Sequence, residues 1–396
     1  MNFVKSRLFE IVLFSFIFII TLSQFLSVRL IFVLLLLSFF IKFSRVSLFH
    51  VFNRSWDIFL YLLVMIIGLT YSSDLFQGFK VVETSFSLLA IPIIFYGVTI
   101  DVNRFRWALM SFISGLFVAC IICLSYSGFK FIQTGDSSVF YFEKLTSIIN
   151  TQPTYMAYYL CFALTVGLYF LYLENIKISI SLVVWSLVLF FIVLMLTGGR
   201  TAYVSMVFVF SFFILKFLFD EVRLNHKRIA FALAVIFMVS MLVINQYNFN
   251  SSNGEFYGDY WERITLWNSA INASKDYIFG VGTGDYKYVL NEYYKAQGLN
   301  EYAQGNLNSH NQFIQSFFSN GIFGLMALTI IIARPLYLSF KIQNSLGILI
   351  IFPFIMYGVT EVFLGRYQGV VFFALCHQIV VFQYYLIKQD FSLKNT

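Results

Sequence analysis

Apolar runs close to 20 residues long recur from one end of this sequence to the other, and they constrain its fold more than any other feature. A helix of about 20 apolar residues is long enough to cross the ~30 Å hydrocarbon core of a bilayer. The chain is 60% hydrophobic and only 11% charged, a composition that excludes an ordinary soluble domain. We therefore predict an all-α, polytopic membrane protein.

We expect about twelve transmembrane helices, which together form a single integral membrane domain over residues 1–396. The expected spans are 8–23, 25–41, 56–71, 82–100, 107–127, 153–173, 179–197, 201–219, 229–246, 309–333, 345–363 and 367–387. With a cytoplasmic N-terminus, the inside loops collect many Lys and Arg residues, Arg334 and Lys341 among them. This arrangement satisfies the positive-inside rule in one orientation only.

The basic loops and the cysteines have simple explanations. The net charge of +7 does not indicate a nucleic-acid partner, because membrane topology already accounts for the Lys and Arg in the loops. All four cysteines fall inside expected spans, and Cys120-x-x-Cys123 has no second pair of ligands. We interpret the cysteines as small apolar packing residues.

Two polar segments lie on the outer side in this topology. One is 128–152, and the other, 247–308, is the longest polar stretch of the chain, inserted between spans 9 and 10. A loop of that length without a function would be unusual. Within it we expect an amphipathic helix at 259–273, a turn at 280–284 and a second short helix at 291–304. The apolar side of the first helix would consist of Trp261, Ile264, Leu266, Trp267 and Ile271.

This long segment leads into the helix expected at 309–333. Ser309 and Gln312 have the spacing of a capping box, which would place His310 in the first helical turn. The positive end of the helix dipole disfavours an imidazolium ion, so we expect a neutral His310 that can accept a proton from an attacking hydroxyl. Gly321 lies about three turns further on. With Gly324 it should let that face pack closely against a neighbouring helix.

Several charged residues are expected at the outer ends of helices. Arg200 lies in the hairpin Leu196-Thr-Gly-Gly-Arg-Thr-Ala202, where a guanidinium beside a helix N-terminus suits phosphate. The alternative for Arg200 is an interfacial arginine. Arg263, on the 259–273 helix, either contacts solvent or headgroups or belongs to the site. Glu361 and Arg366 bracket the last outer turn, where they either form an ion pair between two helices or join the site.

Cations together with a neutral histidine suit transfer from a diphosphate-linked donor. Arginine would hold the anionic leaving group while His310 takes a proton from the incoming hydroxyl. No carboxylate pair with metal-binding spacing accompanies these residues, so we expect no metal ion and no cofactor. The remaining histidines, His50, His226 and His377, are expected to be structural.

Two motifs carry a resemblance to a known family. His310-Asn311, nine residues and then Gly321-x-x-Gly324 resembles the H-[NSQ]-x9-G-x-x-[GTY] pattern of the bacterial O-antigen ligase and polymerase family. The hairpin around Arg200 is similar to that family's S-R-[TS]-[AG] motif, with Gly199 in place of the usual serine. Asn320 stands where an acidic residue is common. The long loop before the histidine helix also matches the family layout.

The resemblance implies a membrane glycosyltransferase of the GT-C-like type in the bacterial inner membrane, with its active site on the periplasmic side. It implies metal-independent transfer of a glycan from undecaprenyl diphosphate to a sugar hydroxyl, on lipid A–core or on a growing chain. Arg200 and Arg263 would bind the diphosphate and His310 would activate the acceptor. Asn311, Glu361 and Arg366 are counted with the substrate-binding residues.

The acceptor separates a ligase from a polymerase, and the sequence does not name it. We favour the ligase because of the His–Asn–Gly spacing and keep the polymerase as the alternative. A transporter or lipid flippase is the other class considered. Such proteins place charges near the bilayer midplane on discontinuous helices, often with internal repeats, whereas the ionisable residues of this sequence are expected at one face.

Overall fold

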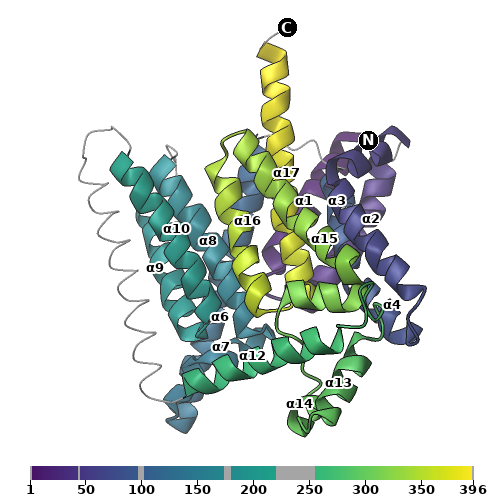
Figure 1. Ribbon diagram of the computed structural model, residues 1–396. Coiled ribbons are helices and arrows are strands. Elements are labelled where there is room, and N and C mark those ends of the chain that lie inside the picture. Colours follow the sequence, from purple (N-terminus) through teal and green to yellow (C-terminus); the bar gives the residue numbers. More distant parts are fainter. Residues whose placement is uncertain (1, 43–44, 97–101, 174–179, 220–254, 395–396) are drawn as a thin grey trace. The chain divides into compact units, whose positions relative to one another are not determined.

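The computed structural model describes residues 2–42, 45–96, 102–173, 180–219 and 255–394 (Figure 1). Every regular element in these ranges is helical, as the sequence predicts. Six helices among them are long and apolar enough to cross a membrane. Three shorter apolar helices, Gln24–Ser38, Ser181–Thr197 and Ser345–Thr360, add to these. The predicted number of twelve spans is not confirmed, and the span expected at 229–246 lies outside the described residues.

The chain divides into two compact units. Unit 1 comprises residues 1–11, 31–101 and 256–396, and unit 2 comprises residues 12–30 and 102–255. Two of the boundaries between the units fall inside α1 (Asn2–Ile19) and α2 (Gln24–Lys42). The prediction of one integral membrane domain over residues 1–396 stays a prediction.

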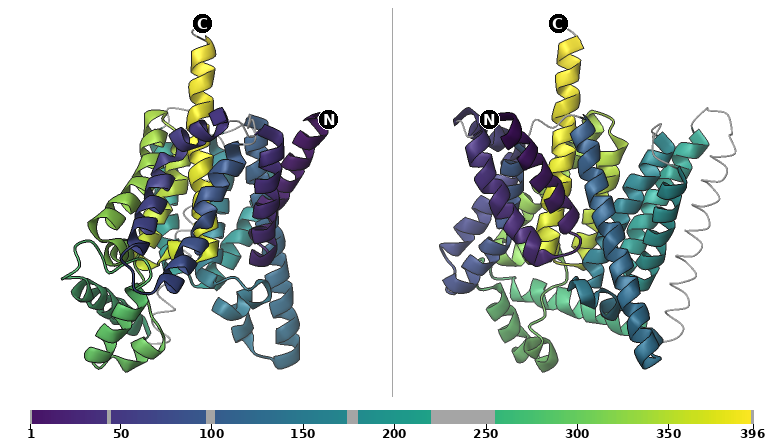
Figure 2. Two further views of the ribbon diagram at one scale, coloured as in Figure 1. Left: turned by 90° about the vertical axis from the view of Figure 1, so that its right-hand side faces the viewer. Right: turned by 180° about the vertical axis from the view of Figure 1, so that it is seen from behind.

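Unit 1 combines apolar helices with a group of more polar ones. The apolar helices are α3 (Arg45–Leu69), α4 (Leu75–Thr84), α5 (Phe86–Tyr96), α15 (Gln312–Lys341), α16 (Ser345–Thr360) and α17 (Tyr367–Lys394). The helix α15 packs against α16, the next helix along the chain, and also against α3 and α17. The more polar helices, α12 (Glu255–Ala273), α13 (Tyr286–Ala296) and α14 (Asn300–Gln304), lie at the end of the unit away from the C-terminus (Figures 1 and 2).

The polar helices of unit 1 have a small apolar core of their own. Leu266 of α12 and Leu290 and Tyr294 of α13 are buried together, and Phe318 of α15 completes the cluster. The amphipathic helix expected at 259–273 is therefore confirmed as α12, but Leu266 is its buried anchor while Trp261 and Ile271 are exposed. The second helix expected at 291–304 is divided into α13 and α14.

Unit 2 contains three helices whose bounds were predicted to within one residue, at 153–173, 180–197 and 200–219, and one that extends beyond both ends of its expected span 107–127. The unit includes α6 (Val102–Thr134), α7 (Phe142–Thr146), α8 (Pro153–Leu173), α9 (Ile180–Thr197) and α10 (Arg200–Phe219), with short 3-10 turns at Ser137–Phe140 and Ser147–Ile149. Within the unit α8 packs against α6, α9 and α10. Large apolar side chains such as Leu182 and Trp185 of α9 are exposed. Such a surface suits lipid better than water.

A buried charge cluster joins three apolar helices of unit 1. Both carboxylate oxygens of Asp57 in α3 are engaged, one by Arg334 Nη1 of α15 at 2.6 Å and the other by His377 Nε2 of α17 at 2.7 Å. Asp57 and His377 are fully buried and Arg334 is nearly so. Next to the cluster, α3 has a non-helical residue at Ser55, whose hydroxyl exchanges hydrogen bonds with the Gln378 side chain.

This cluster corrects two expectations. Arg334 was expected in an inside loop, but it lies within α15 and pairs with Asp57. Ionisable residues were also expected to cluster at one face, whereas Asp57 is fully buried within the candidate span Phe49–Leu69. The sequence signal that we missed is the single aspartate inside the expected span 56–71. Its carboxylate is stable there because two helices supply it with cationic or hydrogen-bonding partners.

Removing one partner of this cluster should destabilise unit 1. Arg334→Met leaves the buried Asp57 carboxylate with His377 as its partner, and breaking a buried ion pair typically costs about 3–5 kcal/mol. The unfolding temperature in detergent can be followed with a thiol-reactive dye, since all four cysteines are buried and free. The double variant Asp57→Leu/Arg334→Met removes both charges and should regain much of the lost stability. Equal unfolding temperatures for wild type and Arg334→Met would contradict a structural role.

Candidate active site

The helix that follows His310 begins later than the sequence suggested. The first residue of α15 is Gln312 and its N-cap is Asn311, whose side-chain oxygen accepts hydrogen bonds from Phe313 N at 2.9 Å and Ile314 N at 3.0 Å. The expected capping box of Ser309 and Gln312 is therefore wrong. Ser309 is buried, and its hydroxyl donates to Asn311 O and contacts Gln315 Oε1. Asparagine has a better cap geometry here because its carbonyl reaches two free backbone N–H groups at once.

His310 precedes the helix instead of lying in its first turn. Its backbone is left-handed, with φ at +42°, and its N–H donates to Asn308 Oδ1 at 2.8 Å. The imidazole Nδ1 lies 3.6 Å from Glu361 Oε2, and the ring keeps 33% of its surface exposed. The close ionisable partner of the ring is thus a carboxylate. The expectation of a neutral ring, which rested on a position in the first helical turn, loses that basis.

Glu361 is held in place by its own turn. It is the C-cap of α16, and its Oε1 accepts a hydrogen bond from Val362 N at 3.1 Å. Burial alone would raise the pKa of this carboxyl, but contact with His310, the Val362 N–H and the Arg366 charge together lower the pKa below its ordinary value. The carboxylate is therefore ionised at neutral pH, and its contribution to stability would be lost as the pH falls through that lowered pKa.

Gln312 ties the turn that carries Glu361 to the start of α15. Its Oε1 accepts a hydrogen bond from Leu364 N at 2.8 Å, and its Nε2 donates to Ser316 Oγ at 3.2 Å. Gln312 is buried, so both of its polar ends have partners where water does not reach. Sequence reasoning treated Gln312 only as a capping residue and missed this role, because a contact across 52 residues leaves no local pattern.

The helix α15 is broken at Asn320 and Gly321, which have non-helical backbone angles (Figure 1). Gly321 has φ at +61° and ψ at −152°, a conformation that essentially only glycine adopts. The face on which His310 and Gly321 were expected to align is therefore absent. Gly321 does allow close packing, as predicted, but its neighbours are Ile278 and Phe279 of a loop and not another helix.

That loop, residues 278–285, supplies partners for the backbone groups that the break exposes. Val281 N donates to Phe318 O at 3.0 Å and Gly282 N donates to Ser319 O at 2.9 Å, while Ile322 N donates to Ile278 O at 3.1 Å. A Cβ on Gly280 would collide with the backbone of Asn320 and Gly321. The glycines at 280–284 thus form the expected turn, and their small size serves this docking.

The same loop also contacts the end of α3 and the start of α4. Thr283 Oγ1 donates to Met65 O at 2.7 Å and accepts from Asn320 Nδ2 at 2.8 Å. The Asp285 carboxylate accepts both Ser73 N and Asp74 N at 2.7 Å. Residues far apart in the sequence are joined in this way around the break, and Thr283 and Asp285 were not singled out by sequence reasoning.

Two of the predicted site residues lie on other elements. Arg263 lies on α12 in unit 1 and is half-buried. Arg200 is the first residue of α10 in unit 2, one position earlier than expected, and follows a turn in which Gly198 has φ at +65°. A Cβ at Gly198 would collide with the Phe142 ring, so the glycine is required there. Within unit 1 the structure brings His310, Asn311, Glu361 and Arg366 together.

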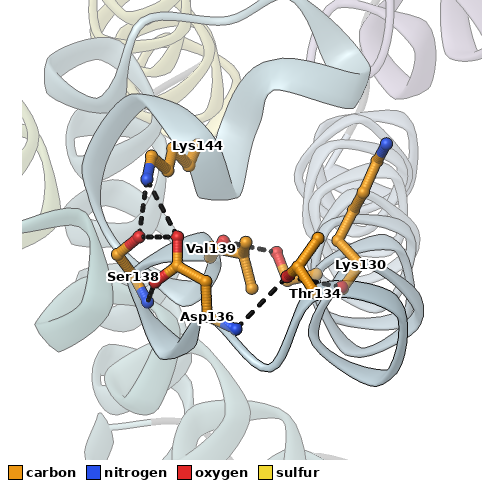
Figure 3. Close-up of polar contacts among 7 residues, drawn as sticks. Lys130, Thr134, Asp136, Ser138, Val139 and Lys144 are labelled. Carbon is orange, nitrogen blue, oxygen red and sulfur yellow. Dashed lines mark hydrogen bonds and ion pairs between the residues drawn. The ribbon is translucent and has the colours of Figure 1, made fainter.

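The polar segment 128–152 of unit 2 comprises the end of α6 and the short helices that lead to α8. Figure 3 shows polar contacts among its side chains. Asp136 caps the turn at Ser137–Phe140, and Lys144 Nζ lies 3.3 Å from Asp136 Oδ2. Hydrogen bonds from Ser138 and the contact with Lys144 lower the pKa of Asp136 to about 2. These side chains are exposed to solvent, so the pair contributes little to stability.

The region that contains His310 is similar to a known protein family. The family model described as O-antigen ligase matches residues 185–329. These residues are an O-antigen ligase domain. The matched ligase domain includes Arg200, Arg263 and His310, and it ends before Glu361.

One curated relative is similar to part of the chain. An uncharacterised protein of Haemophilus influenzae (strain Rd) is 28% identical over 122 residues, which are 28% of this chain and 31% of the relative. The match thus spans about a third of that relative's length. The similarity to O-antigen ligases therefore covers residues 185–329 of this chain.

The conformation of Gly321 generates a prediction for the ligase domain. Gly321→Ala adds a Cβ that collides with Ile278 and Phe279 and forces a strained backbone, at a cost of about 1–3 kcal/mol from the strain alone. We expect a lower unfolding temperature in detergent. The matched control is Gly128→Ala in α6, where the space around the glycine is open and alanine should be neutral or stabilising. An effect no larger at 321 than at 128 would contradict the docking of the loop.

Proposed function

We propose that this protein transfers a glycan from undecaprenyl diphosphate to a sugar hydroxyl at the periplasmic face of the bacterial inner membrane. The observation that supports the proposal most strongly is the half-exposed His310 beside an anchored carboxylate, inside the matched ligase domain. A histidine held in this way is suited to accept a proton from a hydroxyl. The lipid donor would reach the protein from the membrane, and the six candidate spans among the described residues support this route.

In this proposal the arginines bind the donor. Arg200 is the first residue of α10, and a guanidinium beside a helix N-terminus suits a phosphate. Arg263, half-buried on α12 of unit 1, is proposed as a second phosphate-binding residue. Charge that develops on the departing diphosphate would be stabilised by these cations. The mechanism that we propose uses no metal ion.

Two other functions stay open on specific grounds. A polymerase of the same family uses the same kind of donor and differs in its acceptor, which can be lipid A–core or a growing chain. A polysaccharide-lipid transporter is favoured by two features, the break in α15 and the Asp57 cluster inside the apolar helices. We still prefer glycosyl transfer, because the family match covers His310 and because both oxygens of Asp57 already have protein partners.

His310→Ala should abolish transfer while leaving membrane insertion intact. Loss of a general base typically lowers the rate by about 10²–10⁴-fold. The variant is expressed in cells without the wild-type gene, and surface glycans and lipid-linked glycans are separated on gels. Complete loss of glycan from lipid A–core, with polymer accumulating on the lipid, identifies a ligase, whereas a single attached repeat unit identifies a polymerase. His50→Ala is the matched control, and normal glycans in His310→Ala cells would refute the proposal.

Arg200→Lys should weaken donor binding although the positive charge is kept. A lysine ammonium cannot form the two parallel hydrogen bonds by which arginine binds a phosphate. The loss of one such charge-assisted bond, about 1.5–3 kcal/mol, corresponds to roughly 10- to 100-fold in affinity. Binding of a diphosphate-linked lipid to purified protein measures this effect. Arg104→Lys, near the start of α6, serves as the matched control, and equal affinities in both variants would exclude Arg200 from the donor site.

A further inference from the structure

Glu361 is placed where it can control which nitrogen of His310 carries the proton. The carboxylate faces Nδ1 of the imidazole, not Nε2. In a neutral imidazole the nitrogen beside a hydrogen-bond acceptor carries the proton, and the other nitrogen keeps its lone pair. A carboxylate at Nδ1 therefore favours the tautomer in which Nε2 is the base.

The distance between the two groups is compatible with this role. At 3.6 Å, Nδ1 and Oε2 are further apart than in a formed hydrogen bond. Catalytic hydrogen bonds are often long in the absence of substrate and shorten in the reactive complex. The carboxylate is 18% exposed and the imidazole 33% exposed. The ring is therefore open on one side while the carboxylate is mostly covered.

Both partners are held by bonds that do not involve the pair itself. The His310 N–H is bound to Asn308 Oδ1, which helps to maintain the left-handed backbone. Glu361 Oε1 is bound to Val362 N, and Leu364 N of the same turn is bound to Gln312 Oε1. The turn that bears the carboxylate is thus fastened to the helix that follows the histidine. Such anchoring fixes the geometry of the pair.

We propose that Glu361 is the positioning residue of this site, which holds His310 with the proton on Nδ1 and the lone pair on Nε2. The inference rests on the proposed glycosyl transfer. Nε2 takes the proton of the acceptor hydroxyl, and the acceptor oxygen forms a bond to the anomeric carbon of the donor sugar. The bond from that carbon to the diphosphate oxygen breaks, and undecaprenyl diphosphate leaves with the electron pair. The imidazolium that forms is stabilised by the Glu361 carboxylate and then releases its proton to solvent.

The tautomer can be observed directly, without an activity assay. The chain contains only four histidines, so protein labelled with ¹⁵N in the imidazole rings gives few nitrogen signals, and subtraction of the His310→Ala spectrum assigns those of His310. At a pH where the ring is neutral, wild type should show the Nδ1–H form. In Glu361→Gln the Nε2–H form should gain population, since a carboxamide can donate a hydrogen bond to Nδ1. An unchanged tautomer in this variant would overturn the inference.

Kinetics provide the second readout. Glu361→Gln should lower kcat by at least about 10²-fold, as expected when the base is in the wrong tautomer, with KM for the donor unchanged. Glu361→Asp keeps the charge and should restore part of the rate. The matched control is Glu292→Gln, which removes an exposed carboxylate from α13. A raised KM with normal kcat would make Glu361 a substrate ligand instead and would overturn the inference.

The two proposals fail in different ways. If His310→Ala transfers glycan normally, the base role fails whatever the tautomer of His310 is. If His310→Ala is inactive but Glu361→Gln retains the wild-type tautomer and kcat, the proposed function stands and the role of Glu361 is rejected.

Discussion

The packing of unit 1 depends on one set of hydrogen bonds, those between the backbone exposed at the break in α15 and the loop that covers it. In an apolar environment a helix can be interrupted only if other groups satisfy the exposed backbone. The carbonyls of Phe318 and Ser319 and the N–H of Ile322 lose their helical partners at Gly321, and residues 278–282 provide replacements. Thr283 and Asp285 of the loop in turn form hydrogen bonds to the end of α3 and to the backbone just before α4. The half of α15 that follows His310 is thereby fixed in place.

This arrangement explains how a polar site is built at the end of an apolar helix. The first half of α15 carries buried polar side chains, Gln312, Gln315, Ser316 and Ser319, which bond to one another and to the turn after α16. Buried polar groups are tolerated because each has a partner. These hydrogen bonds hold the start of α15, which follows His310, and the turn after α16, which carries Glu361, in fixed positions. The Asp57 cluster joins α3, α15 and α17 further along the same helices.

The fold class and many helix bounds could be predicted from the sequence, and so could the importance of the region around His310. The helix at 153–173 was predicted to the residue because an apolar run flanked by polar residues is a local signal. The capping box failed because Asn311 competes with Ser309 for the same free N–H groups, and local spacing does not decide between them. Glu361 was predicted to pair with Arg366 or to bind substrate, and its contact with His310 could not be anticipated. Arg334 was assigned to a loop because a charge in an apolar helix is costly unless a distant residue neutralises it.

The sequence by itself determined that this chain is an all-helical membrane protein and, through two short motifs, that it resembles the O-antigen ligases. Hydrophobic length and motif spacing are local properties, so they can be read directly along the chain. Tertiary structure alone decided that α15 is broken, that the glycine loop closes the break and that Glu361 faces His310. Each of these depends on backbone or side-chain groups that are distant in sequence and become partners only when the helices pack.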